Sequence, residues 1–225
     1  MGMQPQADPF IVPVCKEQIE ILYQDSHILL INKPSRLLSL SGKHPLNKDS
    51  VHYRLVQEFP SATLVHRLDF GTSGIMLVAL NKAVNGLLTK QFQARTTHKT
   101  YTALLHGQVP DDDGSIDFPI AKDRPNFPLQ KICQDEGKSA LTNYQVLKRH
   151  KGPDVTRVLF VPVTGRTHQL RIHSQTFGYP ILGCDLYASD AAFFMADRLM
   201  LHATSLDFDH PVSGERISGQ CVCPF

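Results

Sequence analysis

Residues 66–75 read His-Arg-Leu-Asp-Phe-Gly-Thr-Ser-Gly-Ile, and this stretch decides how the rest of the chain is interpreted. An apolar run follows at residues 75–80 and is typical of a buried strand. The carboxylate of Asp69 therefore lies on a loop, where catalytic groups concentrate. Flanking cations and hydroxyls, Arg67 among them, favour the charged form of such an acid. Taken alone, a loop Asp is more often part of a capped turn with a surface salt bridge.

Strand-like and helix-like patterns alternate on both sides of this loop. Apolar alternation predicts strands at residues 19–23, 27–32, 75–80, 100–106, 140–147 and 155–163, and a closing pair from 206. Capping residues and helical spacing predict helices after Asp49-Ser50, from residue 83, around Leu170 and at 190–196. Residues 107–114 are expected to form a polar turn and residues 118–138, which are rich in proline, a long irregular loop. Because strands outnumber helices and short turns join many of them, we expect an α+β fold with a mixed, mainly antiparallel sheet.

Composition excludes several classes of protein. The 225 residues suffice for one substantial domain, and 42% hydrophobic residues is ordinary for a globular chain. No stretch approaches the roughly 20 apolar residues of a membrane span. The first nine residues lack the apolar core of a signal peptide. We therefore expect a cytosolic protein without a membrane partner, in which residues 1–18 form a flexible lead-in.

The cysteines and histidines do not predict a disulfide framework or a metal site. The five cysteines are scattered and contain no Cys-x-x-Cys pair, which fits free thiols in a reducing compartment. His168 and His173 are five positions apart, which is the wrong spacing for the zinc-binding pair on one face of a helix.

The distribution of charge is more informative than its sum. The net charge of +2 is weak evidence for a nucleic-acid partner. Residues 82–101, however, contain four Lys or Arg and no acid, and residues 148–173 contain six against one. Both segments overlap candidate site residues, so they favour a groove that follows a phosphate backbone.

Several further stretches, taken together with residues 66–75, resemble the RluA family of RNA pseudouridine synthases. In chain order these are Ile31-Asn32-Lys33-Pro34, Lys99-Thr100-Tyr101, residues 164–173 (TGRTHQLRIH), residues 180–185 (PILGCD) and residues 198–203 (RLMLHA). The matches run in family order from about Ile19 to about His210. The resemblance therefore covers nearly the whole chain.

The resemblance implies an isomerase that converts uridines in structured RNA loops to pseudouridine, with rRNA or tRNA as its partner. It implies three catalytic residues: Asp69, Tyr101 and Arg171. Five more residues are expected to bind RNA, with Arg67 filling the gap left by a flipped base: Arg67, Arg166, His168, Leu170 and Leu201. His202 is expected either to line the pocket or to support it. No metal and no cofactor are expected.

The same resemblance implies a bent sheet with helices packed on it. It also implies a single catalytic domain at residues 19–225, a monomer without a separate N-terminal RNA-binding module. Residues 125–131 and the compact length suggest the dual-specificity type, which acts on large-subunit rRNA and on a tRNA anticodon stem-loop. Members specific for only one RNA, and an RNA-binding module without catalysis, remain alternatives.

Two other enzyme classes fit the sequence poorly. A kinase catalytic loop would not place Leu68 between Arg67 and Asp69, and the chain has no Gly-rich phosphate loop. A serine hydrolase needs Gly-x-Ser-x-Gly, which residues 71–74 do not supply.

Overall fold

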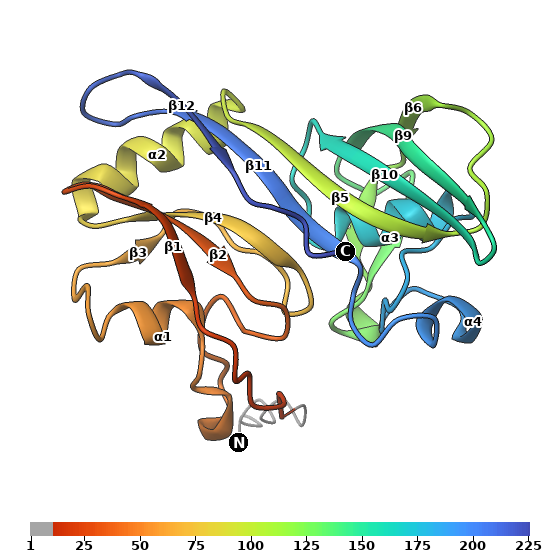
Figure 1. Ribbon diagram of the computed structural model, residues 1–225, viewed down its shortest axis with the longest axis horizontal. Helices are drawn as coiled ribbons and strands as arrows, with labels where there is room; N and C mark the ends of the chain where they lie inside the picture. The colour runs from red at the N-terminus through yellow and green to blue at the C-terminus, as the bar shows by residue number, and fades with distance from the viewer. Residues whose placement is uncertain (1–10) are drawn as a thin grey trace.

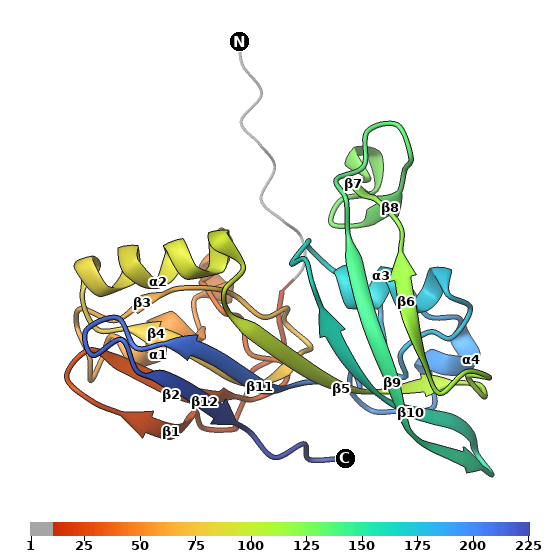
Figure 2. The ribbon, with the colours of Figure 1, turned by 90° about the horizontal axis from the view of Figure 1, so that it is seen from above.

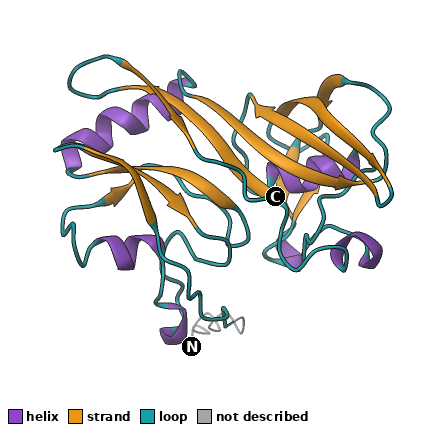
Figure 3. Ribbon diagram, viewed as in Figure 1, coloured by secondary structure: helices purple, strands orange, loops and turns teal. Residues whose placement is uncertain are grey.

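The computed structural model describes residues 11–225. The strands are β1 (Glu20–Gln24), β2 (Ile28–Lys33), β3 (Thr63–Leu64), β4 (Ser73–Ala79), β5 (His98–His106), β6 (Asp113–Asp117), β7 (Ile120–Lys122), β8 (Gln130–Ile132), β9 (Leu141–Lys151), β10 (Asp154–Pro162), β11 (Leu201–Asp209) and β12 (Arg216–Gln220). The helices are α1 (Val51–Leu55), α2 (Lys82–Ala94), α3 (Gln169–Thr176) and α4 (Asp190–Phe193), with 3₁₀ turns η1 (Pro45–Asn47) and η2 (Arg124–Asn126). Strands dominate the described chain (Figure 3).

Ten of these strands form one sheet that runs through the whole molecule. The order is β1-β2-β4-β11-β5-β10-β9-β6, with β12 beside β11 and β3 beside β4. Every pair is antiparallel except β4 with β11, which confirms the expected mixed, mainly antiparallel α+β architecture. The strands β5 and β11 cross the middle and join a first half (β1–β4, α1, α2) to a second half (β6–β10, α3, α4) (Figure 1).

The parallel contact between β4 and β11 is short and requires a glycine. Only two residue pairs form it, Ser73 with His202 and Gly74 with Ala203. Gly74 has φ = +114°, and a Cβ there would lie 2.2 Å from the Ala203 carbonyl oxygen. A side chain would therefore force the two strands apart. Because β4 begins at Ser73, this contact also fixes the end of the Asp69 loop.

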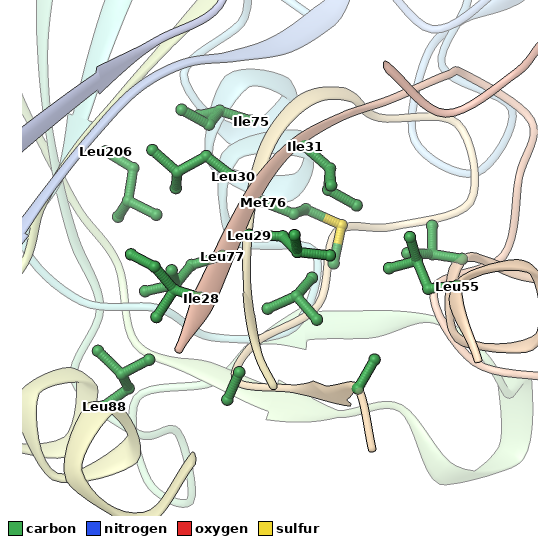
Figure 4. Packing of buried hydrophobic residues seen from close by; sticks show 14 of the residues in the cluster. Ile28, Leu29, Leu30, Ile31, Leu55, Ile75, Met76, Leu77, Leu88 and Leu206 are labelled. Atoms are coloured by element: carbon green, nitrogen blue, oxygen red, sulfur yellow. The ribbon is translucent and has the colours of Figure 1, made fainter. Parts of the chain in front are cut away.

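The first half contains the larger hydrophobic core. Both faces of β2 and β4 are buried, which explains why these strands read as continuous apolar runs. Leu55 of α1 and Leu88 of α2 pack into the same cluster (Figure 4). Each fully buried side chain of this size contributes roughly 1.5–3 kcal/mol of transfer free energy.

The predicted helices α1 and α2 each begin at a residue whose side chain caps the first turn. The Tyr53 N–H donates to the Ser50 hydroxyl at the start of α1, and the Val84 N–H donates to the Asn81 side chain at the start of α2. α1 is shorter than expected and ends at Leu55, well before Pro60. α4 also ends early, at Phe193.

The prediction of an irregular loop at residues 118–138 is wrong. The segment forms the hairpin β7–β8, which closes through η2 and projects from the second half (Figure 2). Ile120 pairs with Ile132, and both pack against Ile172 of α3. The prolines lie at the base and in the turn, where no ladder N–H is required, so they do not prevent pairing. The expected polar turn at 107–114 is also shorter, because β6 begins at Asp113.

The expected lead-in at residues 1–18 lies in part, residues 1–10, outside the described residues. From Ile11 onward the chain contacts the first half, where the Arg54 guanidinium donates to the carbonyls of Cys15 and Glu17, both at 2.6 Å. All five cysteines are free thiols. Over residues 11–225, no helix is both long and apolar enough to cross a membrane.

Candidate active site

A cavity of about 520 Å³ opens where the Asp69 loop, β5 and the loop before α3 meet. All eight site residues expected from the sequence line it: Arg67, Asp69, Tyr101, Arg166, His168, Leu170, Arg171 and Leu201. They come from segments that are far apart in the chain, so the fold brings the separate motifs together. Asp69 is the one acid among the described residues that line this cavity.

The Asp69 loop is anchored by its neighbour Leu68. The Leu68 side chain is 7% exposed and belongs to the larger core. The Ser39 hydroxyl donates to the Leu68 carbonyl at 2.7 Å, and the Leu68 N–H donates to the same hydroxyl at 3.2 Å. The Thr72 N–H donates to the Asp69 carbonyl at 3.1 Å, which closes the turn. With its backbone held in this way, Asp69 presents a carboxylate that is 30% exposed to the cavity.

A buried lysine ties this loop to the end of β2. The Lys33 ammonium is fully buried and donates to three carbonyl oxygens, those of Pro34 (2.9 Å), Leu37 (2.7 Å) and Phe70 (3.3 Å). Burial lowers the pKa of Lys33 to about 7, while the nearby Asp69 charge acts in the opposite direction. The three acceptors also favour the ammonium form. Lys33 therefore holds the residue after Asp69 by a charged hydrogen bond.

Arg171 of α3 lies between two carboxylates. Its side chain is 5% exposed, and Nη1 lies 3.6 Å from an Asp69 carboxylate oxygen, while Nη2 donates to Asp185. Nε donates to the Cys184 thiol at 3.4 Å, and the Tyr187 ring lies 5.4 Å from the guanidinium carbon. Burial acts to lower the pKa of Arg171, but the neighbouring thiol and the two carboxylates outweigh it and raise the pKa. Arg171 is thus fixed in place before any substrate binds.

Tyr187 connects this arrangement to the projecting hairpin. Its hydroxyl lies 2.8 Å from His168 Nδ1 and accepts the Gln130 N–H of β8 at 2.9 Å. Burial raises the pKa of Tyr187 to about 12, so the hydroxyl keeps its proton and can donate to the imidazole. Burial lowers the pKa of His168, which favours its neutral, accepting form.

Tyr101 lies on β5, in the middle of the sheet. It pairs with Phe160 of β10 and with Ala203 of β11, and its side chain packs against both core clusters. Burial, and secondarily the Asp69 charge, raises the pKa of Tyr101. The hydroxyl is therefore a neutral phenol at physiological pH.

Another part of the cavity lining is a stacked pair of rings, which together with Lys99 forms what we call the Lys99 side. His66 and Phe92 stack with centroids 4.8 Å apart, and the Leu77 N–H donates to His66 Nε2 at 3.0 Å. The Lys99 ammonium lies over the Phe92 ring, 5.6 Å from its centroid. Burial, and secondarily Lys99, lowers the pKa of His66 to about 3, so this histidine stays neutral.

Two residues that are not among the eight expected site residues support the site: His202, and Gln169 within residues 164–173. His202 faces away from the cavity, with Nδ1 2.8 Å from the Ser73 hydroxyl, and lines a second cavity. Gln169 is buried, and its side-chain oxygen accepts from the Thr164 hydroxyl at 2.8 Å and from the Arg166 N–H at 2.9 Å. Both therefore fix loops that carry cavity residues.

Sequence reasoning gave no role to several residues that shape the cavity or its supports: Lys33, His66, Lys99, Cys184, Asp185 and Tyr187. All but Tyr187 lie inside the stretches that resemble the family, so the motifs contain them without showing what they contact. Among residues 11–225 there is no group of three His, Cys, Asp or Glu side chains that could hold a metal ion.

Comparison with known proteins gives one consistent result. Residues 27–176 match the family described as RNA pseudouridylate synthase. The dual-specificity RNA pseudouridine synthase RluA of Yersinia pestis is 49% identical over 205 residues, which cover 91% of this chain and 99% of that protein. The protein of the same name from Escherichia coli strain K12 is 42% identical over 228 residues, which cover both chains completely. The solved structure of human RNA pseudouridylate synthase domain containing 1 superposes with a TM-score of 0.79 at 32% identity, covering 95% of this chain and 86% of that one.

Proposed function

Since the chain belongs to the RNA pseudouridylate synthase family, we propose that it isomerises uridine to pseudouridine in two RNAs, large-subunit rRNA and a tRNA anticodon stem-loop. The name "dual-specificity" of the relatives in Yersinia pestis and Escherichia coli supports two substrates. Loops with splayed bases suit an enzyme that must take its target nucleotide out of a stack.

Asp69 is the catalytic carboxylate in this proposal. The reaction breaks the bond from ribose C1′ to uracil N1, turns the base and joins C1′ to C5. A carboxylate serves as the nucleophile or stabilises positive charge on the sugar, and the net reaction involves neither oxidation nor an energy source. The anchored loop supports this assignment, as does the fact that Asp69 is the one acid among the described residues that line the cavity.

Tyr101 stacks on the target base and handles the proton that leaves C5. Because burial raises its pKa, the phenolate is scarce, so the hydroxyl accepts a proton only as it passes its own onward. The ring supplies roughly 1–3 kcal/mol of stacking. Arg171 places its positive charge 3.6 Å from the Asp69 carboxylate and maintains that charge through its other partners.

The remaining cavity residues bind and shape the RNA. Arg67 is exposed on the Asp69 loop and fills the gap left by the flipped base. Arg166 and His168 contact the RNA from the loop before α3, and two apolar side chains enclose the base: Leu170 and Leu201. Residues 19–225 act as one catalytic domain in a cytosolic monomer.

The observation that carries the proposal is the meeting of the three motif residues in one cavity, with Arg171 beside Asp69. The test is to incubate the purified protein with total RNA from a strain that lacks it and to map new pseudouridines. We expect sites in both rRNA and tRNA. Sites in only one class of RNA would reject dual specificity, and no site in either would reject the proposed activity.

Asp69→Asn provides the matched control. The amide preserves shape and hydrogen bonding but can neither attack carbon nor stabilise a cation, so we expect product formation to be abolished while the thermal unfolding temperature and RNA affinity remain close to wild type. Near-wild-type turnover in this variant would remove Asp69 from the mechanism.

A further inference from the structure

The Lys99 ammonium lines the cavity and has no acidic partner among residues 11–225. Among the ion pairs of the described residues, none involves Lys99, so no carboxylate lies within 4.0 Å of it. Burial lowers the pKa of Lys99, as expected for a cation removed from water without compensation. An uncompensated ammonium in such a place favours binding of an anion.

Three segments fix the position of this ammonium. The Phe92 ring of α2 lies under it, and that ring is itself stacked on His66. On another side, a Cβ built on Gly165 would lie 3.7 Å from Lys99 Nζ, so the ammonium lies next to the loop before α3. The charge is therefore held at one point, unlike that of a solvated surface lysine.

The strand directs Lys99 toward the reacting centre. Alternate residues of a strand face the same side, so Lys99 and Tyr101 of β5 project together, and both line the cavity. Three other cations line it, and of these Arg171 already has two carboxylate partners. Among the described residues, Lys99 is therefore one of the lining cations that have no carboxylate partner, and it is the one beside Tyr101 on β5.

We infer that Lys99 binds a backbone phosphate of the RNA next to the target uridine and so fixes the register of that nucleotide over Tyr101. The inference rests on the proposed function and adds a binding residue to it. A compact ammonium suits a single phosphate oxygen better than the edge of a base, which calls for donors in a planar, paired arrangement.

The test compares three substitutions of Lys99 in the protein. The RNA used is an anticodon stem-loop oligonucleotide. Lys99→Met keeps the aliphatic contact with Phe92 and removes the charge, Lys99→Gln removes the charge with a polar replacement, and Lys99→Arg keeps the charge. Lys16→Met, in an exposed residue before β1 that does not line the cavity and lies outside both basic segments, is the matched control. The dissociation constant is measured over a series of salt concentrations, and turnover is measured at saturating RNA.

We expect Lys99→Met and Lys99→Gln to weaken binding about 10- to 100-fold. The slope of log Kd against log salt should decrease by about 0.7–0.9, as for one lost phosphate contact, while Lys99→Arg and Lys16→Met stay near wild type. Turnover at saturating RNA should change only a few-fold. A wild-type slope in whichever of the two uncharged variants folds would overturn the inference.

A second arm locates the phosphate. Single neutral methylphosphonate linkages are placed at successive positions around the target uridine. Wild type should lose affinity at one linkage beside that uridine, and Lys99→Met should be insensitive at the same linkage. Equal sensitivity of both proteins at every linkage would overturn the inference. Pseudouridine formation by wild type in this oligonucleotide tests the proposed function separately, because the salt slope and the linkage scan measure binding alone.

Discussion

The two sides of the cavity hold their cations differently. On the Arg171 side, the guanidinium already contacts Asp69, Asp185 and the Cys184 thiol. On the Lys99 side, the ammonium rests on an aromatic ring and has no acid within 4.0 Å among the described residues. The first arrangement has its charged partners without RNA and, in the proposed mechanism, takes part in the reaction, whereas the second has a positive charge that we infer pairs with an RNA phosphate. Within one cavity, the charge that is held in place before RNA binds, on Arg171, is therefore separate from the charge proposed to bind RNA, on Lys99.

After Asp69→Asn, Tyr101→Phe gives the largest expected effect. It tests whether turnover and RNA binding depend on different residues of the same β-strand, β5. The ring still stacks, but the hydroxyl that passes on the C5 proton is gone, so we expect turnover to fall by roughly 10²–10⁴-fold. RNA affinity should stay within a few-fold of wild type, opposite to the expectation for Lys99→Met two residues earlier. The measurement is single-turnover kinetics of wild type and Tyr101→Phe, with the dissociation constant for RNA determined in parallel. Equal losses in both quantities would mark Tyr101 as structural.

Asp185→Asn tests the Arg171 side by removing one of its two carboxylates. The guanidinium loses its close charged partner, and its orientation toward Asp69 is no longer fixed. We expect turnover at saturating RNA to fall about 10- to 100-fold, because small misplacement of a catalytic group has effects of this size. The salt slope of binding should be unchanged, since no phosphate contact is lost. A changed slope with unchanged turnover would place Asp185 in RNA binding instead.

Arg67→Ala tests a cation that belongs to neither side. If Arg67 occupies the gap of a flipped base, folded stem-loops should react about 10-fold more slowly, because an offset to the unstacking energy is lost. A short unstructured strand has little stacking to lose and should be affected less. The measurement compares the reaction rates of wild type and Arg67→Ala on the folded stem-loop and on the unstructured strand at the same salt concentration. Equal slowing, together with a reduced salt slope, would identify Arg67 as a second phosphate contact like Lys99.

His66→Gln gives the smallest effect and concerns stability on the Lys99 side. The pKa of His66 is about 3 in the folded protein and about 6.5 when unfolded. Between these values the unfolded chain binds the extra proton, so the free energy of unfolding decreases as pH falls below 6.5, by up to about 1.4 kcal/mol per pH unit. Glutamine can accept the Leu77 N–H without titrating, so the variant should show a shallower dependence in denaturant unfolding between pH 7 and pH 5. Parallel curves for the two proteins would show that His66 does not titrate in this way.

The sequence predicted the sheet well because its central strands are buried on both faces. The apolar runs of β2 and β4 are visible without any tertiary information. The hairpin β7–β8 was missed because each strand has only three residues and its stability comes from Ile172, which lies about forty positions away from its closer strand. Short strands that depend on a distant partner carry no periodicity of their own.

The same limit applies to the cavity. Motif resemblance identified Asp69, Tyr101 and Arg171, and the structure places all three on one cavity. It did not indicate that Arg171 has a second carboxylate partner in Asp185, nor that Lys99 has no carboxylate partner within the described part of the chain. Such partners are set by the packing of separate segments. Which charges are compensated is a property of the three-dimensional arrangement, and residue identity does not determine it.

The short parallel contact beside Gly74 also has a consequence for synthesis of the protein. Ser73 and His202 are 129 positions apart, so the end of the Asp69 loop stays unpaired on that side until β11 has been translated. Contacts of such long sequence separation form late in folding. A partly synthesised chain on the ribosome therefore lacks the closed cavity, and the RNA that surrounds a growing chain meets a competent enzyme only after β11 has emerged.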